Sequence, residues 1–224
     1  MSTDARRGLP ACVPLWPWHR ERLAEGGCSE EALATVERRA LEALATRARP
    51  APGRLRLSIL VTPAGEVDAR LSDRLSSLDV PGGPRIALVR VEAPPPLPRA
   101  AAKPAERAYW DDAMRRARPA QQAVLVGPDG DVLDGGTATV WALAGGRLVT
   151  PPAPPAVAGV ARRFLLENAS RLGVPVVVEP LLSSALRSAE EVFLTNALGG
   201  AVPARGRGGE VASRAAALFG EVWA

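Results

Sequence analysis

A proline-rich segment near the middle of the chain limits how the chain can fold. The run Glu92-Ala93-Pro94-Pro95-Pro96-Leu97-Pro98 contains four prolines, which cannot continue a helix or lie in a central strand. The 224 residues are enough for one sizeable domain or two small ones. We therefore predict an N-terminal lobe of residues 1–92, a linker of residues 93–102 and a C-terminal lobe of residues 103–224.

Helical and strand patterns alternate along both predicted lobes. Apolar spacing predicts helices over residues 17–25, 29–46 with Ser29 as cap, 109–118, 160–171, 183–189 and 210–222. Runs rich in β-forming residues predict strands over residues 54–61, 67–71, 85–91, 123–126, 139–143, 147–150, 174–178 and 192–195. This interleaving predicts an α/β or α+β fold in two lobes.

Composition and charge exclude several classes of protein. Apolar residues make up 47% and charged residues 23%, which are globular values. No apolar run approaches the roughly 20 residues that cross a bilayer, and no signal peptide is evident, so we expect a cytoplasmic protein without membrane contact. The net charge of +4 is spread along the chain without a basic block, which disfavours nucleic acid as a partner. One histidine and two cysteines exclude a zinc site built from those ligands, so no metal is expected.

The split of the basic residues is more informative than their number. Of 28 basic residues, 27 are arginine and one, Lys103, is lysine. A lysine amine can lose its proton and attack a carbonyl, whereas a guanidinium stays protonated. Lys103 is therefore a candidate nucleophile, and chance survival of a surface lysine is the alternative.

The segment that begins at Lys103 resembles the signature of an enzyme family. It reads Lys103-Pro104-Ala105-Glu106-Arg107-Ala108-Tyr109-Trp110-Asp111-Asp112-Ala113. This run is similar to the K-T-T-x-R-x-x-Y-D-x-A pattern of 4-amino-4-deoxychorismate lyases, which belong with the class IV aminotransferases. In that family the lysine holds pyridoxal 5'-phosphate (PLP) at the start of the second domain.

Further segments resemble motifs of the same family in the same order, so the resemblance extends from about residue 15 to the end. A first-lobe segment, residues 19–23, is similar to the H-L-x-R-L helix. The others are residues 130–140 (G-x-V-x-E-G-S-T-S-N-I), residues 148–152 with 158–162 (L-x-T-P-P…P-G-I-T-R), and residues 189–198 with 202–203 (A-D-E-V-F-L-T-N-A-L…V-P).

The resemblance implies a fold, a cofactor and roles for particular residues. It implies the two-lobed D-amino-acid-aminotransferase-like fold of PLP fold type IV, with a shortened N-terminal lobe, and a homodimer that acts on a small amino substrate. Lys103 would hold PLP covalently and move the proton at the substrate carbon, helped by burial beside a cation such as Arg107. Arg107 would also face the phenolate oxygen of the cofactor.

The remaining implied contacts concern the ring nitrogen and the phosphate of the cofactor. Asp134 stands where the family has a glutamate that keeps the ring nitrogen protonated. The phosphate would lie at a helix start, where backbone N–H groups are available. The residues implied around the phosphate are Arg22, Val160, Ala161, Asn196 and Ala197.

The chain departs from the family pattern in ways that bear on activity. Asp134 is one methylene shorter than glutamate, about 1.5 Å of reach. Ala161 lacks the hydroxyl of the family threonine, Thr139 replaces an asparagine, and the family's first strand with its Phe-Glu-Thr motif has no counterpart before the helix at residue 17. On the residues alone, Gly159 could be a simple helix entry and Asp134 the start of a Gly-Gly turn.

Three functions remain open at this point. The Lys103 segment and Thr195-Asn196-Ala197-Leu198 favour a lyase that expels pyruvate and leaves 4-aminobenzoate. A branched-chain or D-amino acid aminotransferase would share every cofactor residue. A degenerate homologue acting as a binding protein is the third possibility.

Overall fold

The structure, a computed structural model, describes residue 9 and residues 13–46, 55–73, 76–93, 97 and 103–223. The chain divides into two compact units, Met1–Leu75 and Ser76–Ala224, and each is described by itself. The sequence placed the division after residue 92 instead. Of the predicted linker, residues 93 and 97 are described, whereas 94–96 and 98–102 lie outside the described residues, so the linker stays a prediction.

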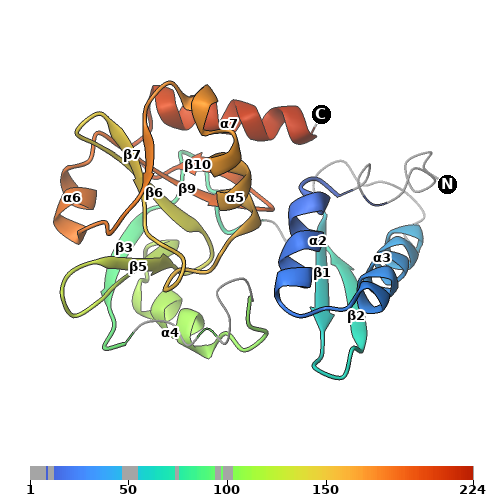
Figure 1. The fold of residues 1–224 in the computed structure, drawn as a ribbon. Helices are drawn as coiled ribbons and strands as arrows, with labels where there is room; N and C mark the ends of the chain where they lie inside the picture. The colour runs from blue at the N-terminus through green and yellow to red at the C-terminus, as the bar shows by residue number, and fades with distance from the viewer. Residues whose placement is uncertain are drawn as a thin grey trace. The chain divides into compact units, whose positions relative to one another are not determined.

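Within residues 13–46 and 55–73, the first unit contains the helices α2 and α3 and a β-hairpin (Figure 1). Ser29 caps the second helix, as predicted, because its hydroxyl accepts a hydrogen bond from the Ala32 N–H at 3.2 Å. A small core that includes Trp16, Val36 and Ala40 lies between the helices and the hairpin. The elements are α2 (Trp16–Glu25), α3 (Glu30–Ala45) and the antiparallel strands β1 (Arg56–Val61) and β2 (Val67–Ser72).

A three-stranded sheet opens the second unit. Its order is β3-β4-β5, with β3 parallel to β4 and β5 antiparallel to β4. Helix α4 connects the two parallel strands and packs on β4. This parallel pairing places β3 in the second unit, whereas the sequence had assigned that strand to the first lobe. The elements are β3 (Ile86–Arg90), α4 (Ala108–Arg116), β4 (Gln122–Val126) and β5 (Val132–Gly135).

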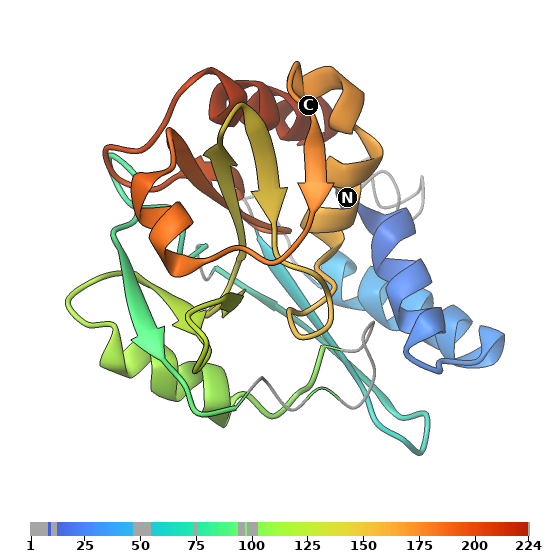
Figure 2. The same ribbon diagram turned by 60° about the vertical axis from the view of Figure 1, so that its left-hand side comes forward.

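A five-stranded sheet of order β10-β9-β6-β7-β8 completes the second unit. Helix α7 packs on β10 and β9 and lies across the sheet from α4 in both views (Figures 1 and 2), and α5 packs on β9. The strands are β6 (Thr139–Ala144), β7 (Arg147–Thr150), β8 (Val176–Val178), β9 (Glu191–Asn196) and β10 (Gly200–Pro203). The helices are α5 (Val160–Glu167), α6 (Ser183–Ser188) and α7 (Glu210–Trp223), with a 3₁₀ helix at Ala169–Leu172.

The predicted mixed α/β fold is confirmed, with local differences in three elements. The helix predicted over residues 160–171 ends at Glu167, and a 3₁₀ turn follows up to Gly173, whose φ of 77° terminates it. Strands β5 and β10 were not predicted, because Val132–Gly135 and Gly200–Pro203 are short, contain glycine and lack an alternating pattern. The β6–β7 hairpin turns at Gly145 and Gly146, both with positive φ, as two-residue hairpin turns require.

Candidate functional site

Lys103 lies just before α4, in a segment without helix or strand. Its side chain is exposed rather than buried. The burial that the sequence led us to expect for its amine is therefore not found in the single chain. The charge of Lys103 nevertheless acts on Asp134, as described below.

Arg107 is the N-cap residue of α4 and links this helix to the loop after β5. Its Nη2 donates to the carbonyl oxygen of Gly136 at 2.7 Å. Its guanidinium also lies over the ring of Trp110, 5.6 Å from the centroid, and its Nε is 3.7 Å from the Asp111 carboxylate. The side chain of Met114 also packs closely on Gly136, because a Cβ there would lie 2.3 Å from the Met114 sulfur. These contacts hold the start of α4 against the end of β5.

Asp134 lies within β5 and is 5% exposed, so it does not begin a turn. Three donors surround its carboxylate. The Trp110 indole Nε1–H donates to Oδ2 at 3.1 Å, the Val157 N–H donates to Oδ2 at 3.3 Å, and the Gly135 N–H donates to Oδ1 at 2.9 Å. The carboxylate therefore ties β5 to α4 and to the segment before α5.

Burial raises the pKa of Asp134 to about 6. The three hydrogen bonds oppose this rise because they favour the ionised carboxylate, and the positive charge of Lys103 does the same. The charge of Asp134 in turn raises the pKa of Arg162, although burial lowers that pKa by more. Lys103 and Asp134 thus belong to one electrostatic environment within the second unit.

No side-chain hydrogen bond caps the start of α5. Its N-cap residue, Gly159, provides no capping side chain, and Val160 and Ala161 are buried in the first turn. N–H groups at the first turn of a helix have no acceptor within the helix, so they can bind a phosphate. A Cβ at Gly159 would lie 3.2 Å from Thr139 Oγ1, so the chain approaches β6 closely there.

Asn196 holds the turn between β9 and β10 together. Its side-chain oxygen accepts hydrogen bonds from the N–H groups of Leu198 at 3.1 Å and Gly199 at 2.7 Å. Its amide nitrogen donates to the Ser76 hydroxyl at 3.2 Å. The side chain is thus committed to the turn, and a phosphate contact at Asn196 or Ala197 would come from the backbone.

Arg22 lies in the other unit, near the end of α2. It is half-buried, and burial lowers the pKa of its guanidinium. Its predicted contact with the cofactor phosphate stays a prediction.

The described residues of the second unit fit pyridoxal phosphate in chemical terms. Lys103 provides an accessible amine for the aldehyde, Asp134 a buried carboxylate for the ring nitrogen, and the start of α5 uncapped N–H groups for the phosphate. PLP supplies an electron sink when bound, and the protein orients it.

Sequence reasoning missed Trp110 and Val157 as neighbours of the carboxylate. Trp110 reads as an apolar residue of a helix, and Val157 contributes a backbone N–H that no residue pattern reveals. One available signal was that Trp110 occupies the tyrosine position of the K-T-T-x-R-x-x-Y-D-x-A pattern.

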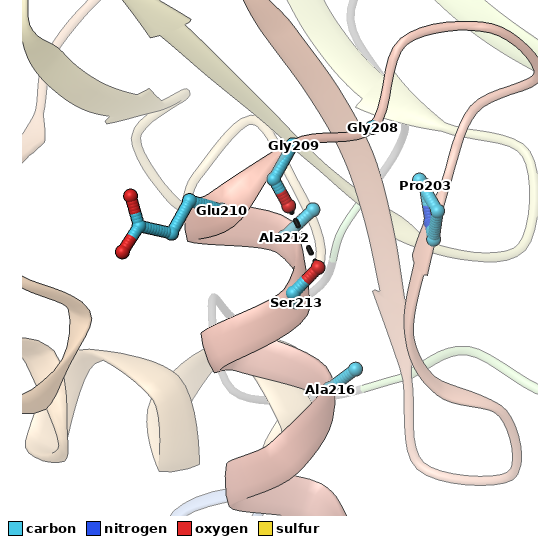
Figure 3. Close-up of a pocket in the computed structure, with 7 residues that line it drawn as sticks. All are labelled: Pro203, Gly208, Gly209, Glu210, Ala212, Ser213 and Ala216. Atoms are coloured by element: carbon cyan, nitrogen blue, oxygen red, sulfur yellow. Dashed lines mark hydrogen bonds between the residues drawn. The ribbon is translucent and has the colours of Figure 1, made fainter.

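A surface hollow of about 470 Å³ lies elsewhere in the second unit (Figure 3). It lies between the end of β10 and the first turns of α7, where the Ser213 hydroxyl donates to the Gly209 carbonyl at 2.8 Å. None of the predicted site residues lines it. Its lining residues are Pro203, Gly208, Gly209, Glu210, Ala212, Ser213 and Ala216.

Among the described residues, no helix has the length and apolar character needed to cross a bilayer. No group of three or more histidine, cysteine, aspartate or glutamate side chains within those same ranges is placed to hold a metal ion.

Comparisons with solved structures define the class of fold as that of the fold type IV transaminases. The branched-chain amino acid aminotransferase of Escherichia coli is 20% identical with a TM-score of 0.73, over 90% of this chain and 77% of that one. A hypothetical aminotransferase of Mycobacterium tuberculosis in its PLP-bound form is 21% identical with a TM-score of 0.69, over 99% and 92%. A fold IV transaminase of Curtobacterium pusillum is 22% identical with a TM-score of 0.60; this chain covers 64% of its length, and 76% of this chain is matched.

Sequence comparison identifies the family itself. The amino-transferase class IV family matches residues 13–206. No curated protein sequence matches the chain. The chain therefore belongs to the class IV aminotransferases, a family of PLP-dependent enzymes.

Proposed function

We propose that this chain binds PLP covalently through Lys103 and catalyses a reaction at an amino-bearing carbon. The observation that carries the proposal is the buried carboxylate of Asp134, which hydrogen bonds from Trp110, Val157 and Gly135 hold in place. A nucleophilic amine and a carboxylate that holds a ring nitrogen protonated are the two groups that PLP chemistry needs from a protein.

The other site residues would bind and orient the cofactor. The N–H groups at the start of α5 would hold the phosphate, with Val160 and Ala161 as the first-turn residues and backbone donors of Asn196 and Ala197 beside them. Arg22 would add a charge-assisted contact from the first unit. Arg107 would place a positive charge near the phenolate oxygen from its position at the N-cap of α4, just after Lys103 in the chain.

The reaction that the sequence favours is that of a 4-amino-4-deoxychorismate lyase. Lys103 would take the proton from the carbon that bears the 4-amino group, and loss of pyruvate would leave 4-aminobenzoate. The Lys103 segment and Thr195-Asn196-Ala197-Leu198 support this specificity.

A branched-chain or D-amino acid aminotransferase is the second candidate. Its support is the likeness of the fold to the branched-chain aminotransferase of Escherichia coli. Lys103 would then move a proton at the α-carbon of an amino acid, and the amino group would pass to a 2-oxo acid.

Covalent trapping tests the cofactor proposal. Purified protein incubated with PLP should gain a visible absorption band, and borohydride followed by peptide mapping should place the label on Lys103. The Lys103→Arg variant keeps the positive charge but cannot form the bond, so it should show neither. Because Lys103 is the only lysine, the N-terminal amine of this sequence is the control position.

The outcomes separate the three functions. Protein without colour or adduct, or label confined to the N-terminal amine, would reject the enzyme and support a non-catalytic homologue. If label is on Lys103, release of pyruvate from 4-amino-4-deoxychorismate would identify the lyase. Transfer of an amino group from a branched-chain or D-amino acid to 2-oxoglutarate would identify the aminotransferase. We also propose a homodimer.

A further inference from the structure

A buried indole and a buried carboxylate meet in the second unit. Trp110 and Asp134 are 2% and 5% exposed, and the indole Nε1–H donates to Asp134 Oδ2 at 3.1 Å. A buried indole N–H needs an acceptor, which many neutral groups could provide. Here the acceptor is a carboxylate, and a hydrogen bond to an ionised carboxylate is about twice as strong as one between neutral groups.

The hydrogen bonds around Asp134 are unevenly distributed between its two oxygens. Oδ2 accepts from Trp110 and from the Val157 N–H, whereas Oδ1 accepts from the Gly135 N–H. A carboxylate offers about four acceptor positions, so these three donors leave one position at Oδ1 for a further donor. Trp110 and Val157 therefore determine which oxygen remains available.

The indole ring of Trp110 is itself held in place. The Arg107 guanidinium lies over the ring, 5.6 Å from its centroid. The Tyr109 ring meets it edge-on at 5.5 Å between centroids. Since Arg107 also donates to the Gly136 carbonyl, the ring is linked to the chain two residues after the carboxylate.

We propose that Trp110 is a positioning residue that holds the Asp134 carboxylate with Oδ1 available to the ring nitrogen of the cofactor. Aspartate replaces the longer glutamate of the family pattern, and the indole reaches from α4 to orient this shorter side chain. The inference rests on the proposed function for the identity of the ring, but the link between Trp110 and Asp134 exists without it.

Three ionisable groups, Lys103, Tyr109 and Arg162, interact electrostatically with this carboxylate. The charge of Lys103 lowers the pKa of Asp134. Burial and then the charge of Asp134 raise the pKa of Tyr109, whereas burial lowers the pKa of Arg162 by more than the charge of Asp134 raises it. A substitution of Trp110 leaves all three groups in place, so a change in the titration of Asp134 would report the lost indole hydrogen bond.

The first test uses the protein without cofactor and follows two signals by NMR as the pH is changed. The indole N–H resonance of Trp110 should move with a midpoint at pH about 6, and this movement should vanish in Asp134→Asn. The carboxyl carbon of Asp134 should titrate about one pH unit higher in Trp110→Phe, a tenfold change in its proton dissociation constant.

Trp141→Phe is the matched control. Trp141 is also fully buried in the second unit and donates to the Thr195 hydroxyl at 3.0 Å, so the variant loses a comparable ring and hydrogen bond. It should leave the midpoint of Asp134 unchanged. An equal shift in both variants, or no shift in Trp110→Phe, would overturn the proposal. If Trp110→Phe does not fold, the wild type still tests the proposal. A Trp110 indole N–H resonance that does not shift as Asp134 titrates would overturn the proposal.

The second test compares PLP with an analogue that carries carbon in place of the ring nitrogen. Compared with the wild type, Trp110→Phe should bind PLP about tenfold more weakly. It should bind the analogue as tightly as the wild type does. Equal weakening for both compounds would mean that Trp110 only packs the site, and the positioning role would be rejected. Failure of the wild type to bind PLP would reject the proposed function, while the NMR test would still decide the link between Trp110 and Asp134.

Discussion

At the scale of single residues, burial and hydrogen bonding have opposite effects on the pKa of Asp134. Its carboxylate is nearly enclosed, and enclosure favours the neutral acid. Three donors and the charge of Lys103 favour the ionised form, and the pKa settles at about 6. A group that titrates there can be ionised at neutral pH without being far from protonation, which suits a partner for a pyridine nitrogen.

This pKa predicts how stability depends on pH. The ordinary value is 3.8, so the folded state keeps its proton to a higher pH than the unfolded state. The resulting stability is fully present below about pH 4 and is lost as the pH rises through about 6. We expect the free energy of unfolding, relative to Asp134→Asn, to fall by roughly 3 kcal/mol over that window.

Urea unfolding of both proteins at several pH values measures this difference. All other titratable groups are common to the two proteins, so Asp134→Asn is its own control for them. Parallel stability curves between pH 4 and 7 would mean that the carboxylate titrates near its ordinary value.

At the scale of elements, Glu191 connects the five-stranded sheet to α7. It is 7% exposed at the start of β9, and its Oε1 and Oε2 accept hydrogen bonds from the N–H groups of Val211 at 3.2 Å and Ala212 at 2.8 Å. A carboxylate at a helix N-terminus accepts hydrogen bonds from N–H groups that have no acceptor within the helix, and its negative charge interacts favourably with the positive end of the helix dipole. The glutamate of the family motif thus has a structural function here.

Replacing this cap should destabilise the fold. We expect Glu191→Ala to lower the free energy of unfolding by roughly 2–4 kcal/mol, because two buried N–H groups lose their acceptors. Glu190→Ala alters an exposed neighbour and should change it by less than about 0.5 kcal/mol. Chemical denaturation checks both values, and similar values for the two variants would contradict the capping role.

At the scale of the whole molecule, the chain combines two units of unequal size. The second unit contains the residues predicted for the amine, the carboxylate and the helix start, whereas Arg22, whose contact with the cofactor stays a prediction, lies in the first. The hairpin of the first unit already packs on helices through a small core. The expectation of a dimer therefore comes from the family resemblance, which implies a site completed across a subunit interface.

We therefore expect a homodimer in solution. Light scattering coupled to size-exclusion chromatography should report twice the chain mass of 23.4 kDa. The mass should not change on dilution through the micromolar range, because an interface that completes an active site has to be a stable one. A mass equal to one chain would contradict this prediction.

The sequence by itself determined the positions of most elements, because local apolar spacing and turn residues set them. Ser29 as a cap and Gly145-Gly146 as a hairpin turn are examples. It also singled out Lys103, since only a lysine can supply the amine. These properties depend on a residue and its near neighbours along the chain.

Only the tertiary structure decided which elements pair and which side chains meet. The pairing of β3 with β4 joins residues about 36 apart, so no local pattern could assign β3 to the second unit. The bond from Trp110 to Asp134 likewise spans 24 residues. Each depends on long-range packing, which determines the environment of the carboxylate and therefore its pKa.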